Sequence, residues 1–211
     1  MLIVILEILG TIAFAVSGAM VGIRRGMDVF GVTVLGVVTA VGGGMVRDVT
    51  MNKVPAALTS PHYVVMAIVT SLIVFTVAFF RKRLPKMRAK QFYDVLMLLM
   101  DSLGLGIFTV MGVRAGFEAG YAYNSFLLAF LGVITAVGGG LLRDMMAGVP
   151  PYIFVKHVYA CASVAGAVLC VFLYHAVGQD AALIFPAILV FLIRILAAWF
   201  RWNLPRVESF D

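Results

Sequence analysis

Long runs of apolar residues, separated by short polar links, make up almost the whole chain. A helix that crosses a lipid bilayer needs about 20 mostly apolar residues, and seven of the runs are near that length. The links between them carry proline and glycine, which interrupt regular structure. The pattern predicts transmembrane helices over residues 2–23, 28–51, 62–80, 92–113, 123–146, 156–175 and 181–201.

The composition places the chain among membrane proteins. Of its 211 residues, 63% are hydrophobic and 12% are charged, and the mean hydropathy is +1.08. Soluble domains are about 45–50% apolar and about 25% charged. The sequence has no phosphate-binding glycine loop, no nucleophile elbow and no zinc-ligand signature. We therefore expect an all-α polytopic membrane protein that is not an enzyme and has no cofactor and no resident metal.

Basic residues are concentrated in one link between helices. The formal net charge is +6, and six of the 16 lysines and arginines lie within residues 81–90. A basic balance can indicate nucleic-acid binding, but cytoplasmic loops of membrane proteins carry the same excess. We expect no nucleic-acid partner. The charge distribution predicts an N-terminus outside the membrane and a C-terminus in the cytoplasm.

One stretch of the sequence occurs twice. Residues 36–48 read GVVTAVGGGMVRD and residues 132–144 read GVITAVGGGLLRD, a spacing of 96 residues. The similarity extends to the flanking helices, where Phe14 aligns with Phe108 and Gly18 with Gly112, at a spacing of 94. The chain is therefore predicted to contain an internal duplication.

Each copy of the duplication holds three predicted helices. We expect a first unit over residues 1–90 that includes the basic link, a second over 91–178, and a seventh helix with a short tail over 179–211. An odd number of spans per unit inserts the second copy upside down. Inverted repeats of this kind place the functional site near the middle of the membrane, at the interface of the two units.

The duplicated stretch carries three consecutive glycines within an apolar segment. Glycine weakens a helix interior by roughly 1 kcal/mol relative to alanine, and irregular backbone at membrane depth is tolerated where it lines a wet cavity. We favour a helix break that exposes carbonyl groups to an ion pathway, over close helix packing. A threonine precedes each triplet; its hydroxyl lines the pathway or bonds back to the carbonyl four residues earlier. The candidate pathway residues are Thr39, Gly42, Gly43, Gly44, Thr135, Gly138, Gly139 and Gly140.

An arginine–aspartate pair follows each triplet: Arg47 with Asp48, and Arg143 with Asp144. Charges within a membrane face a cavity or a partner. Neighbours on a helix point about 100° apart, so we expect the pairs to cross between the repeats, Arg47 with Asp144 and Arg143 with Asp48. These four residues are predicted to gate the pathway. The alternative is that they reach out to the membrane surface.

One acidic residue lies inside the first helix of each unit. Glu7 aligns with Asp101 at the spacing of 94. One interpretation is that they attract cations or couple proton movement. The other is that each is a buried acid hydrogen-bonded across helices. The sequence leaves both interpretations open.

The two GGGxxRD motifs, on the second helix of each inverted unit and followed by a seventh helix, resemble those of the prokaryotic trimeric intracellular cation (TRIC) channels. Their bacterial domain is also called glycine-transporter-like. The resemblance covers essentially the whole chain and implies a homotrimer in the bacterial inner membrane, in contact with membrane lipids. It implies a potassium-permeable pore in each protomer, lined by the kinked second and fifth helices at their glycines. The Lys-Glu-Val motif of the animal members is absent, so phosphoinositide binding is not implied.

Three functions are consistent with the sequence. The first is a channel for potassium and other monovalent cations. The second is an alternating-access carrier for a small amino acid such as glycine, because inverted repeats with broken helices also suit a carrier and half-helix N-termini suit a carboxylate. The third is a structural membrane protein in which the glycines only pack helices.

Overall fold

The computed structural model describes residues 1–80, 86–155 and 158–202, without the side chains of 86–91. Of the basic link used to orient the chain, residues 81–85 therefore lie outside the described residues, and 86–90 are described without their side chains. The long helices are α1 (Leu2–Arg24), α2 (Val29–Thr50), α4 (His62–Phe80), α5 (Lys86–Glu118), α6 (Ser125–Met146), α8 (Tyr159–Ala176) and α9 (Gln179–Trp199). Two single-turn helices, α3 (Ala56–Thr59) and α7 (Tyr152–Val155), precede α4 and α8.

Among the described residues, seven helices are long and apolar enough to cross a membrane, which confirms the predicted all-α fold with seven spans. The main difference is at α5, which continues to Glu118 rather than ending at residue 113. Arg114 and Glu118 form an ion pair one turn apart, and such a pair supports a helix that leaves the apolar region.

The second helix of each unit begins with the same kind of cap. The Asp28 side chain accepts a hydrogen bond from the amide of Gly31 at 2.7 Å, and the Asn124 side chain accepts one from the amide of Leu127 at 3.0 Å. Asp28 and Asn124 are 96 residues apart. An acceptor at this position satisfies an amide that the first turn of a helix leaves unpaired.

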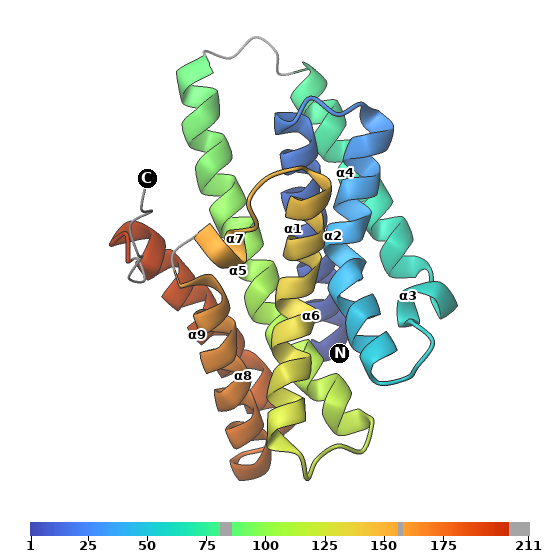
Figure 1. The fold of residues 1–211 in the computed structure, drawn as a ribbon, viewed down its shortest axis with the longest axis vertical. Helices are drawn as coiled ribbons and strands as arrows, with labels where there is room; N and C mark the ends of the chain where they lie inside the picture. Colours follow the sequence, from blue (N-terminus) through green and yellow to red (C-terminus); the bar gives the residue numbers. More distant parts are fainter. Residues whose placement is uncertain (81–85, 156–157, 203–211) are drawn as a thin grey trace, which may run out of the picture.

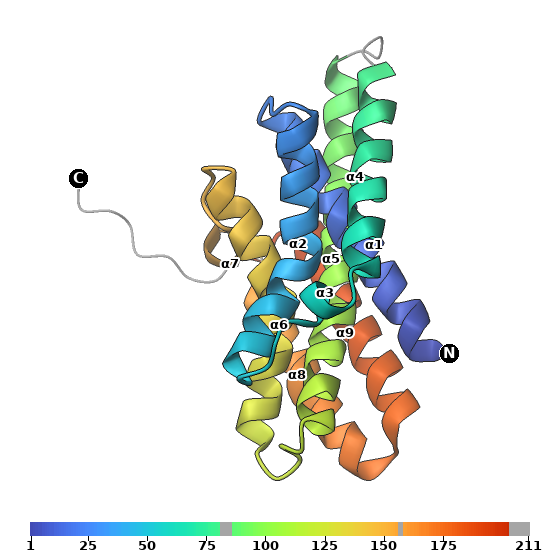
Figure 2. The same ribbon diagram turned by 90° about the vertical axis from the view of Figure 1, so that its right-hand side faces the viewer.

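The two units pack in the same way but run in opposite directions. Helices α1, α2 and α4 contact one another, as do α5, α6 and α8, while α9 packs on α5 and α8. Figure 1 shows α5 running opposite to α1, and α6 opposite to α2. In the view of Figure 2, α2 and α6 cross, and α4 lies to one side of them. The antiparallel directions confirm the inverted repeat.

Equivalent residues of the two units meet in the core. The rings of Phe14 and Phe108 pack with their centroids 5.1 Å apart. The Phe14 ring occupies the space where a side chain at Gly104 would lie, and a Cβ at Gly10 would stand 2.9 Å from Ile107. These glycines therefore let α1 and α5 approach closely.

The same packing joins the first two helices of each unit. A Cβ at Gly18 would overlap the carbonyl oxygen of Leu35, and one at Gly112 would overlap that of Leu131. The two contacts are related by the repeat. The duplication seen in the sequence is thus preserved in the contacts between helices.

Candidate functional site

The triple glycines lie where α2 and α6 cross. A Cβ at Gly43 would overlap the carbonyl oxygen of Thr135, and one at Gly139 would overlap that of Thr39. Both helices continue through their glycines without interruption. The expected helix break is therefore wrong: without side chains the two backbones come into direct contact, and each helix keeps its own hydrogen bonds.

The other glycines of the triplets face different surroundings. A Cβ at Gly42 would meet Leu142 at 2.8 Å, and one at Gly138 would meet the Cα of Gly43 at 3.2 Å. Gly44 is open, with only an Arg47 nitrogen 3.7 Å from its Cβ position. A Cβ at Gly140 would lie 3.0 Å from the hydroxyl of Tyr159. Each triplet thus supplies a contact at the crossing and a small surface beside an arginine.

Both threonines bond to their own helices. Thr39 donates to the carbonyl of Leu35 at 2.6 Å, and Thr135 donates to that of Leu131. Each threonine hydroxyl therefore bonds to the carbonyl four residues earlier, which was one of the two expected arrangements. Thr135 also lines a cavity beside Arg47, whereas Thr39 is fully buried.

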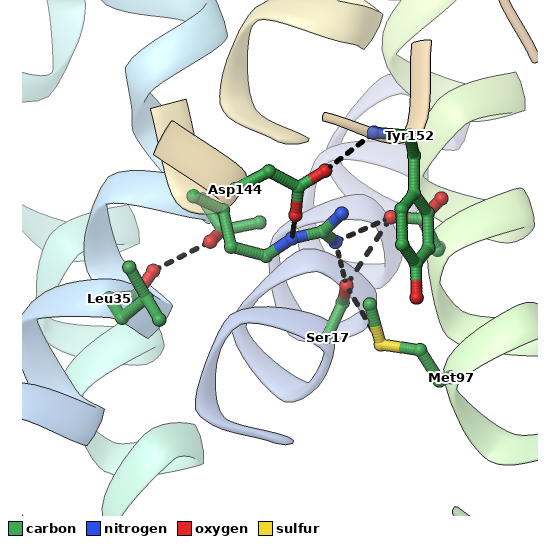
Figure 3. Close-up of polar contacts among 8 residues, drawn as sticks. Ser17, Leu35, Met97, Asp144 and Tyr152 are labelled. Carbon is green, nitrogen blue, oxygen red and sulfur yellow. Dashed lines mark hydrogen bonds and ion pairs between the residues drawn. The ribbon is translucent and has the colours of Figure 1, made fainter. Parts of the chain in front are cut away.

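Arg143 is the centre of a buried polar cluster, of which Ser17 and Asp144 are labelled in Figure 3. Its side chain is 0% exposed. Its Nη1 lies 2.6 Å from Oδ1 of Asp101 and also donates to the Ser17 hydroxyl, and its Nε lies 2.8 Å from Oδ1 of Asp144. We call these four residues the Arg143 cluster. Because they come from α1, α5 and α6, the cluster ties three helices together at one end of the crossing.

Neighbouring groups hold the cluster in place. The second oxygen of Asp144 accepts a hydrogen bond from the amide of Tyr152 at 2.8 Å, and the guanidinium of Arg143 lies 5.1 Å from the Tyr152 ring (Figure 3). Tyr152 belongs to α7, outside the spans, and burial raises its pKa to about 12. Its ring therefore stays neutral beside the guanidinium.

Arg47 and Asp48 repeat part of this arrangement at the other end of the crossing. Arg47 Nε lies 2.8 Å from Asp48 Oδ1, and Asp48 Oδ2 accepts from the amide of Ala56 at 2.9 Å. Ala56 and Tyr152 are 96 residues apart, so each aspartate binds the amide eight residues further on. That amide fixes the carboxylate where the long arginine side chain reaches it.

The predicted cross-pairs are therefore wrong. Each arginine pairs with the aspartate that follows it, and because α2 and α6 are antiparallel, Arg47 and Asp144 lie at opposite ends of the crossing (Figure 1). The alternative of reaching out to the membrane surface also fails for Arg143, which is fully buried. Asp101 agrees with the interpretation of an acid hydrogen-bonded across helices.

A cavity of about 260 Å³ lies beside Arg47. We call it the Glu7 cavity. Its polar lining comes from α1, α2, α4, α5 and α6: Glu7, Thr11, Arg47, Asp48, Tyr63, Arg114, Glu118 and Thr135. Three carboxylates and two guanidiniums thus surround one space.

The charged groups of the Glu7 cavity also contact one another. Glu7 accepts a hydrogen bond from the Tyr63 hydroxyl and lies 3.9 Å from Arg114, which pairs in turn with Glu118. Such a wall can hold a cation between carboxylates, or a zwitterion between groups of both signs.

Several of these residues received no role from the sequence. Ser17 joins the Arg143 cluster, and Tyr63, Arg114 and Glu118 line the Glu7 cavity. Two signals were present in the chain: Arg114 and Glu118 are spaced four apart at the end of an apolar run, and Tyr63 stands 96 residues before Tyr159.

Comparison with known proteins identifies relatives over nearly the whole chain. A family model described as "Glycine transporter" matches residues 4–78 and 98–175. The UPF0126 inner membrane protein YadS of Escherichia coli K12 is 36% identical over 207 residues, which cover 97% of this chain and 94% of YadS. The similarity therefore extends over both units and the seventh helix.

Solved structures share the fold as well. A structure described as the TRIC trimeric intracellular cation channel orthologue from Rhodobacter sphaeroides superposes with a TM-score of 0.83 at 30% identity, covering 95% of this chain and 98% of that one. Another, reported under "Structural basis for conductance through TRIC cation channels", gives a TM-score of 0.83 at 32% identity, with 98% of both chains covered.

Proposed function

From the premise that the chain belongs to the TRIC channel family, we propose that it is a cation channel that conducts potassium and other monovalent cations. Membership of a channel family agrees with the expectation that the chain is not an enzyme. The observation that carries the proposal is the Glu7 cavity, which extends from charged residues at one end to Thr135 near the crossing of α2 and α6. Carboxylates on its wall raise the local concentration of cations.

The proposed pathway runs between α2 and α6. It starts in the Glu7 cavity, passes the glycine crossing and leaves past the Arg143 cluster. In the conformation described, Gly43 and Gly139 are in backbone contact and Arg143 is fully buried between three helices. This conformation is therefore closed at the crossing and at the cluster. Opening requires α2 and α6 to separate and Arg143 to move, because a fixed guanidinium repels a passing cation.

We further propose a homotrimer in a bacterial inner membrane, with one pathway in each protomer. The Rhodobacter sphaeroides relative is described as trimeric, and the Escherichia coli relative as an inner membrane protein. We propose the same units as the sequence predicts, residues 1–90 and 91–178, followed by residues 179–211, which include α9 (Gln179–Trp199). We propose that the N-terminus lies outside. The Glu7 cavity is at the same end of the bundle as the start of α1, so it then faces away from the cytoplasm.

Single-channel recording of the purified protein in planar bilayers tests the function. In asymmetric potassium chloride we expect discrete current steps with a reversal potential close to the potassium equilibrium potential. A reversal potential near that of chloride contradicts the proposal. A changed conductance in the variant Glu118→Gln, which alters the lining of the Glu7 cavity, assigns the current to this protein rather than to a contaminant.

The second candidate is an alternating-access carrier for a small zwitterion such as glycine. It is favoured by the mixed charges of the Glu7 cavity, together with closure of the opposite end by the Arg143 cluster. A carrier gives no current steps but takes up labelled glycine into liposomes with saturation. A silent bilayer combined with saturable uptake would favour this candidate over the channel.

A further inference from the structure

The Glu7 cavity and the Arg143 cluster occupy equivalent places in the two units. Arg47 corresponds to Arg143, and Glu7 corresponds to Asp101. Ser17, which completes the cluster, corresponds to Met111, and Met111 lines the cavity together with Arg47 and Glu7. The same set of positions therefore forms a compact cluster at one end and a cavity at the other.

The difference between the two ends lies in the partner of the acid. At the cluster, Asp101 binds Arg143 at 2.6 Å. At the cavity, Glu7 accepts a hydrogen bond from the hydroxyl of Tyr63. The counterpart of Tyr63 at the spacing of 96 is Tyr159, which stands beside the cluster. One acid is thus paired with an arginine and the other with a tyrosine.

At the cluster, the groups that Asp101 needs in order to pair with a tyrosine are already present. Among the described residues, Oδ2 of Asp101 and the hydroxyl of Tyr159 are buried without a hydrogen-bond partner. The two residues are 1% and 3% exposed. The Tyr159 hydroxyl and Arg143 Nη2 lie 3.0 and 3.7 Å from the Cβ position of Gly140. Buried polar atoms without partners are costly, so their pairing in a second state is a natural explanation.

We propose that Glu7 and Asp101 are exchange residues, each able to bind either an arginine or a tyrosine. In the second state Asp101 leaves Arg143 and accepts a hydrogen bond from Tyr159, which opens the cluster. Glu7 leaves Tyr63 and binds Arg47, which narrows the Glu7 cavity without closing it. The exchange rests on the proposed function only in what it controls, the passage of cations; the change of partners does not depend on conduction.

Arg114 explains why the two ends differ in the state described. It lies 3.9 Å from Glu7, on the cavity wall. Its counterpart at the spacing of 94 is Met20, so the cluster has no equivalent guanidinium from α1. Arg114 and Tyr63 together hold Glu7 away from Arg47. The duplication is therefore biased towards an open cavity and a closed cluster.

The labelling rate of a buried thiol measures the second state without any conduction. Met97 is 3% exposed, and its sulfur lies 3.5 Å from the Ser17 hydroxyl. Met97→Cys, in a background of Cys161→Ala and Cys170→Ala, reacts with a methanethiosulfonate reagent only when the cluster opens. The rate is therefore proportional to the population of the second state.

Two variants that each remove one hydroxyl should act in opposite directions. Tyr63→Phe removes the partner of Glu7 in the state described, so labelling of Met97→Cys should become about twofold to tenfold faster. Tyr159→Phe removes the partner of Asp101 in the second state, so labelling should become slower by a similar factor. A purely structural role of Tyr159 predicts no slowing, because its hydroxyl is unpaired in the state described.

The control is Asp101→Asn, in which the Tyr159 hydroxyl loses its charged acceptor. In that background Tyr159→Phe should change the labelling rate much less than in the parent, which a double-mutant cycle records as coupling. Unchanged labelling in both tyrosine variants, with the protein eluting as one folded species, would overturn the exchange even if the chain conducts. Opposite shifts in labelling without cation current would keep the exchange and reject the channel.

Discussion

Arg143 and Asp101 form an ion pair of 2.6 Å in which the two side chains are only 0% and 1% exposed. The pair joins α6 to α5, and a hydrogen bond from Arg143 to Ser17 adds α1. A charge buried to this degree requires its partner, because desolvation of an unpaired ion costs several kcal/mol. The Arg143 cluster therefore both closes one end of the proposed pathway and stabilises the bundle.

Removing the arginine should be more harmful than removing the acid. Arg143→Met leaves both Asp101 and Asp144 without their common partner, and we expect a loss of about 3–5 kcal/mol in the free energy of unfolding. Asp101→Asn leaves Arg143 paired with Asp144 and should cost about 1–2 kcal/mol. Thermal unfolding of the detergent-solubilised protein gives the comparison, and equal losses for the two variants would contradict this account.

Double-mutant cycles distinguish the observed pairs from the expected cross-pairs. The cycle of Arg143→Met with Asp101→Asn should show a coupling of about 1–3 kcal/mol, since the two residues are in contact. The cycle of Arg47→Met with Asp144→Asn should be additive within about 0.5 kcal/mol, because these residues lie at opposite ends of the crossing. Strong coupling between Arg47 and Asp144 would restore the cross-pair.

The glycines of one triplet should respond differently to alanine. Gly43→Ala places a methyl group onto the Thr135 carbonyl and should destabilise the protein by about 1–3 kcal/mol through overpacking. Gly44→Ala meets only an Arg47 nitrogen at 3.7 Å and should be neutral or stabilising by up to about 1 kcal/mol. Unfolding temperatures of the two variants, prepared side by side, test whether the crossing depends on a single glycine.

The carboxylate of Glu118 should raise cation conductance through the Glu7 cavity. Its side chain is half-exposed at the end of α5. Glu118→Gln should lower the single-channel conductance about twofold in 0.1 M potassium chloride, with a smaller effect in 1 M, where salt screens the charge. Asp180→Asn is the matched control: Asp180 is exposed in the first turn of α9, at the same end of the bundle (Figure 1). Equal effects of the two variants would argue against a path through the Glu7 cavity.

The sequence alone determined the architecture of this protein. The lengths of the apolar runs predicted seven spans, and the repeated GGGxxRD stretch predicted an inverted duplication; the structure confirms both. These features are local, since hydropathy and spacing are properties of consecutive residues. The same stretch also identified the family, and it singled out Arg47, Arg143 and the glycines, whose roles in conduction stay predictions.

Only the tertiary structure decided how those residues interact. Whether Gly43 breaks a helix or packs against Thr135 depends on how closely α2 and α6 approach, which no pattern within one helix contains. The partner of Arg143 depends on the reach of its side chain and on α5 and α1, so Asp101 and Ser17 were not predicted as its partners. The unequal use of Tyr63 and Tyr159 is also a property of the assembled bundle. The two nearly identical stretches share the pairing of each arginine with the next aspartate, but only Arg143 gains further partners, because the two stretches are surrounded by different neighbours.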